Sequence, residues 1–198
     1  KLDSVSINNI QFINSASKDY VDNTNYIITA EPQGSLNYYI RTNSVDATNA
    51  NRFIKVFIDL NSNGIFESTE ELATSGVLTN GGIFNGTITL PNTVSVGQIT
   101  RLRIVAMETS AAANVLACGT YSLGETQDYT LKFKAPSNDL QLSDLINPQN
   151  NACKKGTQFV TVKINNLGGS DQTAFPITLT VKKGTRLSTL NRMEFLSP

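Results

Sequence analysis

The sequence predicts an all-β protein, with a β-sandwich of jelly-roll or immunoglobulin-like type followed by a second, smaller or truncated immunoglobulin-like β-sandwich. Three observations lead to this prediction. Short runs rich in β-branched and aromatic residues recur along the chain, several of them alternate apolar and polar residues, and no stretch has the periodicity of a helix. With 198 residues, the chain is long enough for one large or two modest domains.

Residues 1–135 are predicted to form the first domain from a series of short strands. Alternation is clear around Leu102 and Ile104, which alternate with Arg101 and Arg103. Between two of the runs, the segment 80–82 (NGG) predicts a hairpin turn. The expected strands are Val5–Phe12, Tyr26–Glu31, Leu36–Thr42, Phe53–Ile58, Leu72–Leu78, Ile83–Leu90, Arg101–Met107 and Tyr129–Phe133.

Residues 136–198 are predicted to form a second β domain, which begins at a linker of proline and small polar residues near Pro136. Its length is below the ~100 residues of a seven-strand sandwich, so we expect it to be truncated or only partly represented. The tail Arg186–Pro198 has no clear strand pattern. The expected strands are Leu140–Leu145, Phe159–Asn165 and Pro176–Val181.

Composition excludes several classes of function. Lys+Arg and Asp+Glu both number 16, and without a basic run this balance argues against nucleic acid as a partner. No apolar stretch approaches the ~20 residues that cross a bilayer, and no signal peptide is visible, so we expect a mature or excised fragment. Because histidine is absent, Ser-His-Asp triads and imidazole-ligated metals are excluded.

The chain has two cysteines, Cys118 and Cys153. Two thiolates are too few for a four-cysteine zinc site. In an exported protein they most simply form one disulfide, which here would join the end of the first domain to the second. The alternative is that each cysteine has a partner outside this fragment.

A candidate calcium loop follows the apolar run Phe53–Ile58. The sequence from Asp59 to Glu70 fits the pattern D-x-[DN]-x-[DN]-G-x5-E without a gap. Ca²⁺ takes six to eight oxygen ligands, and side chains at alternate positions of a short loop converge on one point. The predicted ligands are Asp59, Asn61, Asn63, the carbonyl of Ile65, Glu70 and Glu71, with Glu67 as a water-mediated contact.

The same residues have a simpler interpretation as an Asx/Gly turn between two strands, because Asn-Gly is a strong turn signal by itself. An ordinary EF-hand is not expected, since a strand enters the loop and no amphipathic helix follows Glu71. Under the calcium interpretation, Gly64 permits the sharp turn and Glu70 closes the shell in bidentate fashion.

Glu125 and Asp128 invite comparison with the paired carboxylates of glycoside hydrolases. They lie three residues apart at the start of an expected strand, where a turn rather than a cleft sets their geometry. We therefore expect structural roles: capping backbone amides, pairing with Arg101 or Arg103, or supplying a further oxygen to the cation. Asp22 is a further candidate of the last kind, and no catalytic residue is predicted.

Four motifs together resemble the GEVED domain, a module named for a Gly-Glu-Val-Glu-Asp signature. The signature corresponds to Gly124–Tyr129 (GETQDY), and an aromatic-Ile-Asp loop corresponds to Phe57–Phe66 (FIDLNSNGIF). A basic alternating strand corresponds to Thr100–Val105, and a Tyr-x-Asp-x-Thr element to Tyr20–Thr24. The chain departs from the signature at positions 126 and 127 and has Asn at position 63, where the family usually has Asp.

The resemblance, which covers Val5 to Phe133, implies a non-enzymatic accessory module of a large secreted or cell-surface bacterial protein, attached to a peptidase or an adhesin. Its expected partners are neighbouring domains of the same polypeptide and a cell-surface protein or glycan. The second segment, with Val160–Gly168, resembles the start of a CARDB-like immunoglobulin-type repeat. The alternative function is a carbohydrate-binding or adhesive module, in which the cation shapes the ligand face and exposed tyrosines stack on sugar rings.

Overall fold

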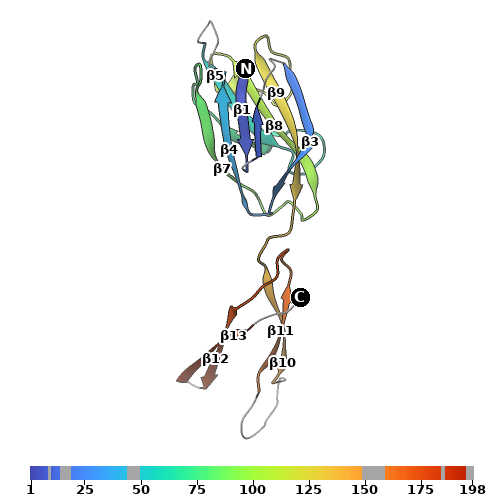
Figure 1. The fold of residues 1–198 in the computed structure, drawn as a ribbon, viewed down its shortest axis with the longest axis vertical. Coiled ribbons are helices and arrows are strands. Elements are labelled where there is room, and N and C mark those ends of the chain that lie inside the picture. The colour runs from blue at the N-terminus through green and yellow to red at the C-terminus, as the bar shows by residue number, and fades with distance from the viewer. Residues whose placement is uncertain (9, 14–18, 44–49, 149–158, 184–185, 195–198) are drawn as a thin grey trace. The chain divides into compact units, whose positions relative to one another are not determined.

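The computed structural model confirms the all-β prediction. It describes residues 1–8, 10–13, 19–43, 50–148, 159–183 and 186–194. The chain divides into two compact units, Lys1–Lys134 and Ala135–Pro198 (Figure 1). The strands of the described residues are β1 (Leu2–Ile7), β2 (Ile10–Ile13), β3 (Tyr20–Ala30), β4 (Ser35–Thr42), β5 (Arg52–Ile58), β6 (Glu71–Thr74), β7 (Ile83–Thr89), β8 (Ile99–Glu108), β9 (Gly124–Phe133), β10 (Leu140–Asn147), β11 (Thr161–Asn166), β12 (Phe175–Lys183) and β13 (Arg186–Glu194).

The first unit is a sandwich of two sheets. One sheet has four strands in the order β2-β1-β4-β7, and the other has five in the order β3-β9-β8-β5-β6. All neighbours are antiparallel except β3 and β9, which run parallel. Figure 1 shows β1, β4 and β7 in front of β8 and β9.

The core lies between the two sheets, where alternate residues of each strand point inward. Burial removes a large apolar area from water, and each fully buried Val, Leu, Ile or Phe side chain contributes roughly 1.5–3 kcal/mol relative to an exposed one. The main contributors are Val5, Ile7, Leu36, Ile40 and Ile88 of the smaller sheet and Ile54, Val56, Ile58, Leu102, Ile104, Tyr129, Leu131 and Phe133 of the larger one.

A second apolar cluster lies on the opposite face of the larger sheet. Phe53, Phe57, Val105 and Val115 are buried there, beside Phe66 and other partly buried side chains. Val115 follows the short 3₁₀ helix η2 (Ala112–Asn114), in the segment that joins β8 to β9. Strand β5 is therefore buried on both faces, which is why it reads as a continuous apolar run rather than an alternating one.

The structure differs from several predicted elements of the first unit. Strands β3 and β9 begin before the predicted Tyr26 and Tyr129, and β6 ends before the predicted Leu78. The predicted strand Val5–Phe12 is two strands, β1 and β2, joined at Asn8, which has a positive φ of 45°. The predicted hairpin at residues 80–82 is also wrong, because β6 belongs to the five-stranded sheet and β7 to the four-stranded sheet. The turn exists, with Gly81 at φ 69°, but it carries the chain from one sheet to the other.

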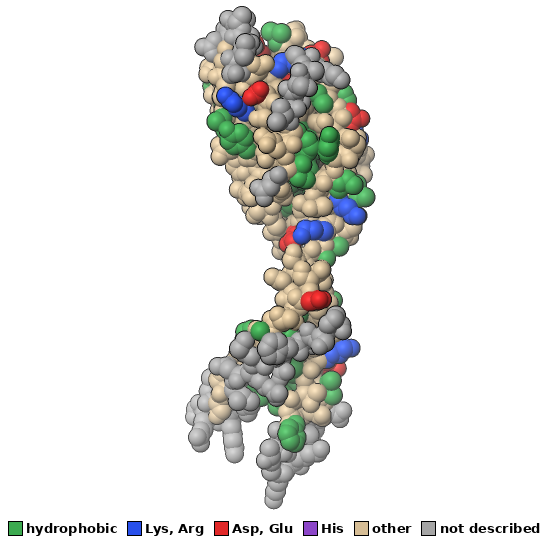
Figure 2. Space-filling view, in the orientation of Figure 1, with side chains coloured by type: hydrophobic (Ala, Val, Ile, Leu, Met, Phe, Trp, Pro, Cys, Tyr) green, Lys and Arg blue, Asp and Glu red, His purple; other side chains and the backbone are tan. Residues whose placement is uncertain are grey.

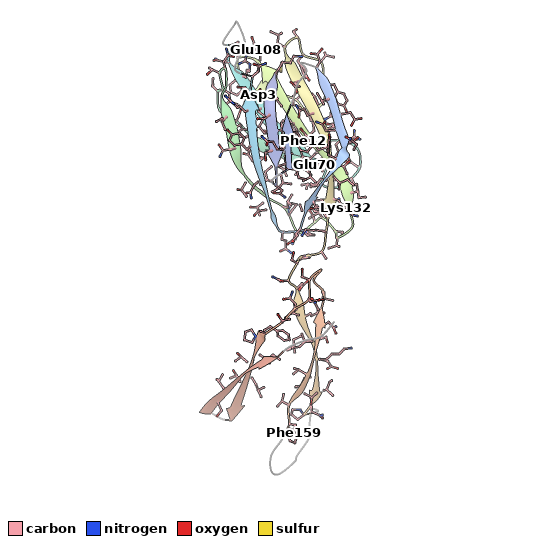
Figure 3. The ribbon with its side chains drawn as sticks, in the orientation of Figure 1. Asp3, Phe12, Glu70, Glu108, Lys132 and Phe159 are labelled. Carbon is pink, nitrogen blue, oxygen red and sulfur yellow. The ribbon has the colours of Figure 1, made fainter. Side chains whose placement is uncertain are left out.

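The second unit contains two antiparallel two-stranded sheets, β10-β11 and β12-β13. The tail from Arg186, which has no clear strand pattern in the sequence, forms β13, and this strand pairs with β12 along its whole length. Its leucines and methionine recur every third residue, so the period-two pattern of a strand is hidden. Large apolar side chains of this unit are exposed, including Phe159 at 84% (labelled in Figure 3). No helix in the described residues is both long and apolar enough to span a membrane.

Candidate metal centre

The candidate calcium loop begins where buried strand β5 ends. The backbone N–H of Asp59 donates to the carbonyl of Arg101 at 3.0 Å, so pairing with β8 continues one residue past Ile58. The Thr100 hydroxyl also donates to the carbonyl of Asp59. Asp59 is consequently only 5% exposed, and the first predicted ligand is held rigidly at the edge of the core.

The Asp59 carboxylate organises the turn that follows it. Its Oδ1 accepts the N–H of Asn63 at 3.1 Å, and its Oδ2 accepts the N–H of Gly64 at 3.0 Å. The backbone passes through positive φ at Ser62 (57°) and at Gly64 (83°). Glycine reaches such a φ without strain, so the sharp bend predicted at Gly64 is present.

The two asparagines of the loop extend the same pattern. Asn61 Oδ1 accepts the N–H of Asn63 at 2.9 Å, and Asn63 Oδ1 accepts the N–H of Ile65 at 2.7 Å. Both side-chain amides donate to Glu67, from Asn61 at 3.3 Å and from Asn63 at 2.6 Å. The hydrogen bond from Asn63 lowers the pKa of Glu67 most. A hydrogen bond with the Glu70 side chain and the bond from Asn61 lower it further.

Glu70 closes the loop from the other side. It is the last residue of the 3₁₀ helix η1 (Ser68–Glu70), is 3% exposed and is labelled in Figure 3. Its Oε1 accepts the N–H groups of Leu60 at 2.7 Å and Asn61 at 3.3 Å, and its Oε2 accepts the N–H of Glu67 at 3.1 Å. Burial raises the pKa of Glu70, and the neighbouring Glu67 raises it further.

The loop therefore gathers the carboxylates of Asp59, Glu67 and Glu70. Among the described residues, the hydrogen bonds to these carboxylates come from neutral amide groups and from the contact between Glu67 and Glu70, and no Lys or Arg forms an ion pair with them. An ionised carboxylate accepts about four hydrogen bonds, so lone pairs remain on all three.

The arrangement is not that of a carboxylate-rich metal cluster. In the part of the chain that is described, no group of three or more His, Cys, Asp and Glu side chains is positioned to hold a metal. A cation at this loop would depend on asparagine and backbone oxygens in addition to the carboxylates. Oxygen ligands of these types suit Ca²⁺, which accepts a flexible geometry.

Glu71, one of the predicted ligands, lies outside the hydrogen-bond network of the loop. Its Oε2 accepts the Lys55 ammonium at 2.7 Å, and its Oε1 accepts the Thr74 hydroxyl at 2.5 Å. Although burial acts to raise the pKa of Glu71, the bonds from Lys55 and Thr74 hold it below its usual value. Asp22 is also remote from the loop network, since its Oδ1 accepts both the N–H and the hydroxyl of Thr24.

Asp128 sits on the outer face of β9, directly opposite Arg103 of β8. Arg103 donates to it twice, from Nε at 2.6 Å and from Nη2 at 2.7 Å, and the Tyr20 hydroxyl donates at 3.0 Å. Arg101 completes the set at 3.4 Å. Asp128 is 0% exposed, so its negative charge is balanced by arginines of its own sheet.

The Arg103 guanidinium also lies over the ring of Phe66, 5.0 Å from its centre. Phe66 belongs to the candidate loop and packs against Phe57 at 6.0 Å between ring centres. The loop and the arginine–carboxylate cluster are thus in contact through one aromatic residue. Phe66 was not predicted to have this role, and the only available signal was an aromatic residue within the calcium pattern, two residues after Gly64.

Glu125 points to the opposite face of β9, into the sandwich. It accepts the backbone N–H of Leu2 in β1 at 3.0 Å and the Gln127 amide at 2.5 Å. Gln127 in turn accepts the Tyr129 hydroxyl. Glu125 and Gln127 are 0% exposed, so this chain of polar groups links the two sheets through the core.

The predicted position of Glu125 and Asp128 at a turn is wrong, because both lie inside strand β9. Residues three apart in a strand point to opposite faces, so the two carboxylates do not face one another as a glycoside hydrolase pair does. The predicted pairing of Asp128 with Arg101 and Arg103 is confirmed.

Strand β9 needs a glycine at its first position, Gly124. A Cβ there would lie 2.7 Å from the Ala106 carbonyl oxygen and 2.7 Å from the Tyr121 ring.

A cavity of about 470 Å³ lies beside the loop. Its lining combines loop residues with the arginine face of β8 and includes Asp59, Phe66, Arg101, Arg103 and Cys118. The exposed Cys118 has its Sγ 3.5 Å from Nη1 of Arg103. The predicted pairing of Cys118 with Cys153 lies outside the described residues, since Cys153 is not among them.

Comparison with known protein families gives a match for one region of the chain. Residues 53–132 match the family model of the GEVED domain, a family of accessory modules. The matched region contains the candidate loop, the arginine strand β8 and most of β9, so the resemblance read from the motifs is confirmed for this part of the chain. No curated protein and no solved structure gives a significant match, and no comparison supports the CARDB-like resemblance of the second unit.

Proposed function

We propose that the first unit, with its GEVED domain at residues 53–132, is a non-catalytic accessory module that holds one structural Ca²⁺ in the loop after β5. The module would belong to a large secreted or cell-surface bacterial protein and would connect or space other domains, such as a peptidase or an adhesin. This proposal is supported by the family, because GEVED domains are accessory modules of secreted proteins.

The observation that carries the calcium proposal is the burial of Asp59 and Glu70 at 5% and 3% exposure, without a cationic partner among the described residues. A buried carboxylate without a counter-charge is costly, and backbone amides offset only part of that cost. Glu67 adds a third carboxylate next to Glu70. A divalent cation would balance these charges, for which the described residues supply no counter-charge.

The ion would act on the sandwich through the residues around the loop. Asp59 continues the pairing of β5 with β8, and Glu70 fixes the entry to β6. Phe66 connects the loop to Phe57 and to Arg103. Fixing the loop would therefore stabilise the larger sheet near its edge and leave the inner core unchanged.

Affinity is expected to be modest. Two of the loop ligands, Asn61 and Asn63, are neutral, and their amides already hydrogen-bond Glu67. Extracellular calcium modules with few charged ligands have dissociation constants of about 10⁻⁴–10⁻³ M. Such a site is filled at millimolar calcium and empties in a chelator.

The experiment that tests the proposal is thermal unfolding of the whole chain in calcium and in a calcium chelator. We expect a higher melting temperature in calcium for the wild-type chain, because a ligand that binds only the folded state stabilises it. Asp59→Ala should abolish the difference, whereas Glu71→Gln, which alters a carboxylate outside the loop network, should retain it. Equal melting temperatures for the wild type in both conditions would contradict the proposal.

The second candidate function is a carbohydrate-binding or adhesive module with a ligand face shaped by the cation. The cavity of about 470 Å³ next to the loop favours it, because Phe66 and Arg101 offer an aromatic surface and hydrogen-bond donors there. Glycan binding that is lost with Asp59→Ala, in a chain that remains folded, would support this candidate over a spacer role.

A further inference from the structure

The outer face of the four-stranded sheet presents a row of side chains, one from each strand. Tyr39 of β4 is directly opposite Ser6 of β1 on one side and Asn85 of β7 on the other, and Ser6 is opposite Gln11 of β2. Directly opposed residues point to the same face of a sheet. With strands about 4.8 Å apart, the row of Gln11, Ser6, Tyr39 and Asn85 extends about 14 Å.

The Tyr39 ring stands open at the middle of this row. Tyr39 is 42% exposed, while its neighbour in sequence, Tyr38, points to the inner face and packs on Phe84 at 4.9 Å between ring centres. An exposed tyrosine presents an apolar ring face together with a polar hydroxyl. It can stack on the apolar face of a sugar ring and hydrogen-bond the rim.

The polar side chains of the row have unused hydrogen-bonding capacity. Among the described residues, no side-chain hydrogen bond involves Gln11, Ser6, Tyr39 or Asn85. The next positions along the same face differ: Thr87 donates to Asn37 at 2.7 Å, and Asn8 accepts the N–H of Asn37 at 2.9 Å. The open groups are thus concentrated around the one exposed ring.

The charge of the face matches a neutral ligand. The row itself carries no ionisable group other than the tyrosine hydroxyl. The nearest charged residues on the same sheet, Arg41 and Asp3, form an ion pair with each other at 3.6 Å. In Figure 2 the side of the first unit that faces the viewer has few Lys, Arg, Asp or Glu side chains.

We propose that this row is a binding site for a neutral glycan, with Tyr39 as the stacking platform and Gln11, Ser6 and Asn85 as hydrogen-bonding groups. Sugars combine apolar ring faces with many neutral hydroxyls, which is the complement of one ring surrounded by amides and hydroxyls. The site is on the sheet opposite to the one that carries the calcium loop, so it goes beyond the function proposed above and does not depend on the cation.

Affinity electrophoresis of the whole chain tests this site, with gels containing hydroxyethylcellulose, laminarin or xylan as neutral polysaccharides and polygalacturonate as an acidic one. We expect at least one neutral polymer to retard the wild-type chain and polygalacturonate not to do so. Tyr39→Ala should weaken the retarding interaction at least tenfold, and Tyr39→Phe, which keeps the ring, should retain most of it. Ile27→Ala, which removes an exposed apolar side chain of β3 on the other sheet, is the control and should bind as the wild type does.

The proposal is overturned if none of the neutral polymers retards the chain, if only polygalacturonate does, or if Tyr39→Ala binds as tightly as the wild type. Asp59→Ala separates it from the calcium proposal. Binding that persists in this variant and in chelator supports the Tyr39 site whatever the outcome of the calcium experiment. Binding lost in a folded Asp59→Ala chain would place the ligand at the loop and would overturn the proposal.

Discussion

The larger sheet of the first unit contains two groups of buried carboxylates that differ in how their charge is balanced. Asp128 is fully buried and has two hydrogen bonds from Arg103, at 2.6 and 2.7 Å. Asp59 and Glu70 are almost as deeply buried, and the described residues give them hydrogen bonds from backbone amides but no Lys or Arg partner. Arg103 balances the charge of Asp128, whereas no cationic side chain among the described residues balances that of Asp59 and Glu70.

This difference explains why similar residues have different roles. The arginine–Asp128 pair is planar and bidentate, so it fixes the register of β8 against β9 and does not need a ligand. In the loop, by contrast, the carboxylates of Asp59 and Glu70 accept hydrogen bonds from backbone N–H groups, and no Lys or Arg among the described residues forms an ion pair with them. We therefore expect substitutions in both groups to lower the stability, but only those in the loop to have an effect that depends on calcium.

The largest expected effect comes from Asp128→Ala. It leaves the half-buried Arg103 without its counter-charge, and breaking a buried pair in this way costs about 3–5 kcal/mol. Urea denaturation should show this loss equally in calcium and in chelator. An Arg103→Met/Asp128→Leu double variant should recover part of the stability, since both charges are removed. A loss under about 1 kcal/mol in the single variant would contradict a stabilising role for the buried Arg103–Asp128 ion pair.

Asp59→Ala should have the next largest effect, and its size should depend on calcium. At about 10 mM Ca²⁺, a site with the expected affinity stabilises the wild-type chain by about 1.4–2.7 kcal/mol, and the variant should lose this increment. In chelator the variant loses only the hydrogen bonds to Asn63 and Gly64, about 1 kcal/mol each. Denaturation curves in the two conditions give both numbers, and an identical loss in each would argue against an ion.

Glu71→Gln is expected to have a moderate effect that does not depend on calcium. Glu71 pairs with Lys55, whose side chain is 9% exposed. The variant leaves this mostly buried ammonium with a neutral amide partner, so we expect a loss of about 1–2 kcal/mol. Because its folded-state pKa lies below the usual value, its contribution is present above the unfolded pKa and is lost as the pH falls through the folded one. A calcium response changed by Glu71→Gln would return this residue to the ligand set.

Asp22→Asn should have the smallest effect, seen only in the pH dependence of stability. The hydroxyl and backbone amide of Thr24 hold the pKa of the exposed Asp22 below its usual value. Its contribution is therefore complete above the unfolded pKa and disappears as the pH falls through the folded pKa. Between pH 7 and pH 2, the melting temperature of the variant should fall slightly less steeply with falling pH than that of the wild type. An equally steep fall would contradict a lowered pKa at Asp22.

The sequence predicted the strands and the loop better than it predicted the contacts between them. Spacing alone placed Asp59, Asn61 and Asn63 in one turn, because their hydrogen bonds are to residues two to five positions away. The roles of Glu71 and Glu125 depend on Lys55 and on Leu2, which are 16 and 123 residues distant. No local pattern encodes such pairings, which follow from how β5, β6, β9 and β1 assemble.

The sheet assignment failed for a related reason. The segment 80–82 has the composition of a hairpin turn, and it does form a turn, with Gly82 N–H bonded to the Thr79 carbonyl at 2.9 Å. Whether the strands on either side pair is decided by the core, which draws β6 to β5 and β7 to β4. The Tyr39 row was equally hidden, because its members come from four strands and meet only through the register.

A calorimetric titration of Ca²⁺ into the whole chain tests most directly whether the loop supplies buried negative charge for an ion. We expect one site per chain with a dissociation constant of about 10⁻⁴–10⁻³ M, no site in Asp59→Ala, and an unchanged site in Glu71→Gln. An absence of binding to the wild-type chain at millimolar calcium, or the same binding in Asp59→Ala, would contradict it.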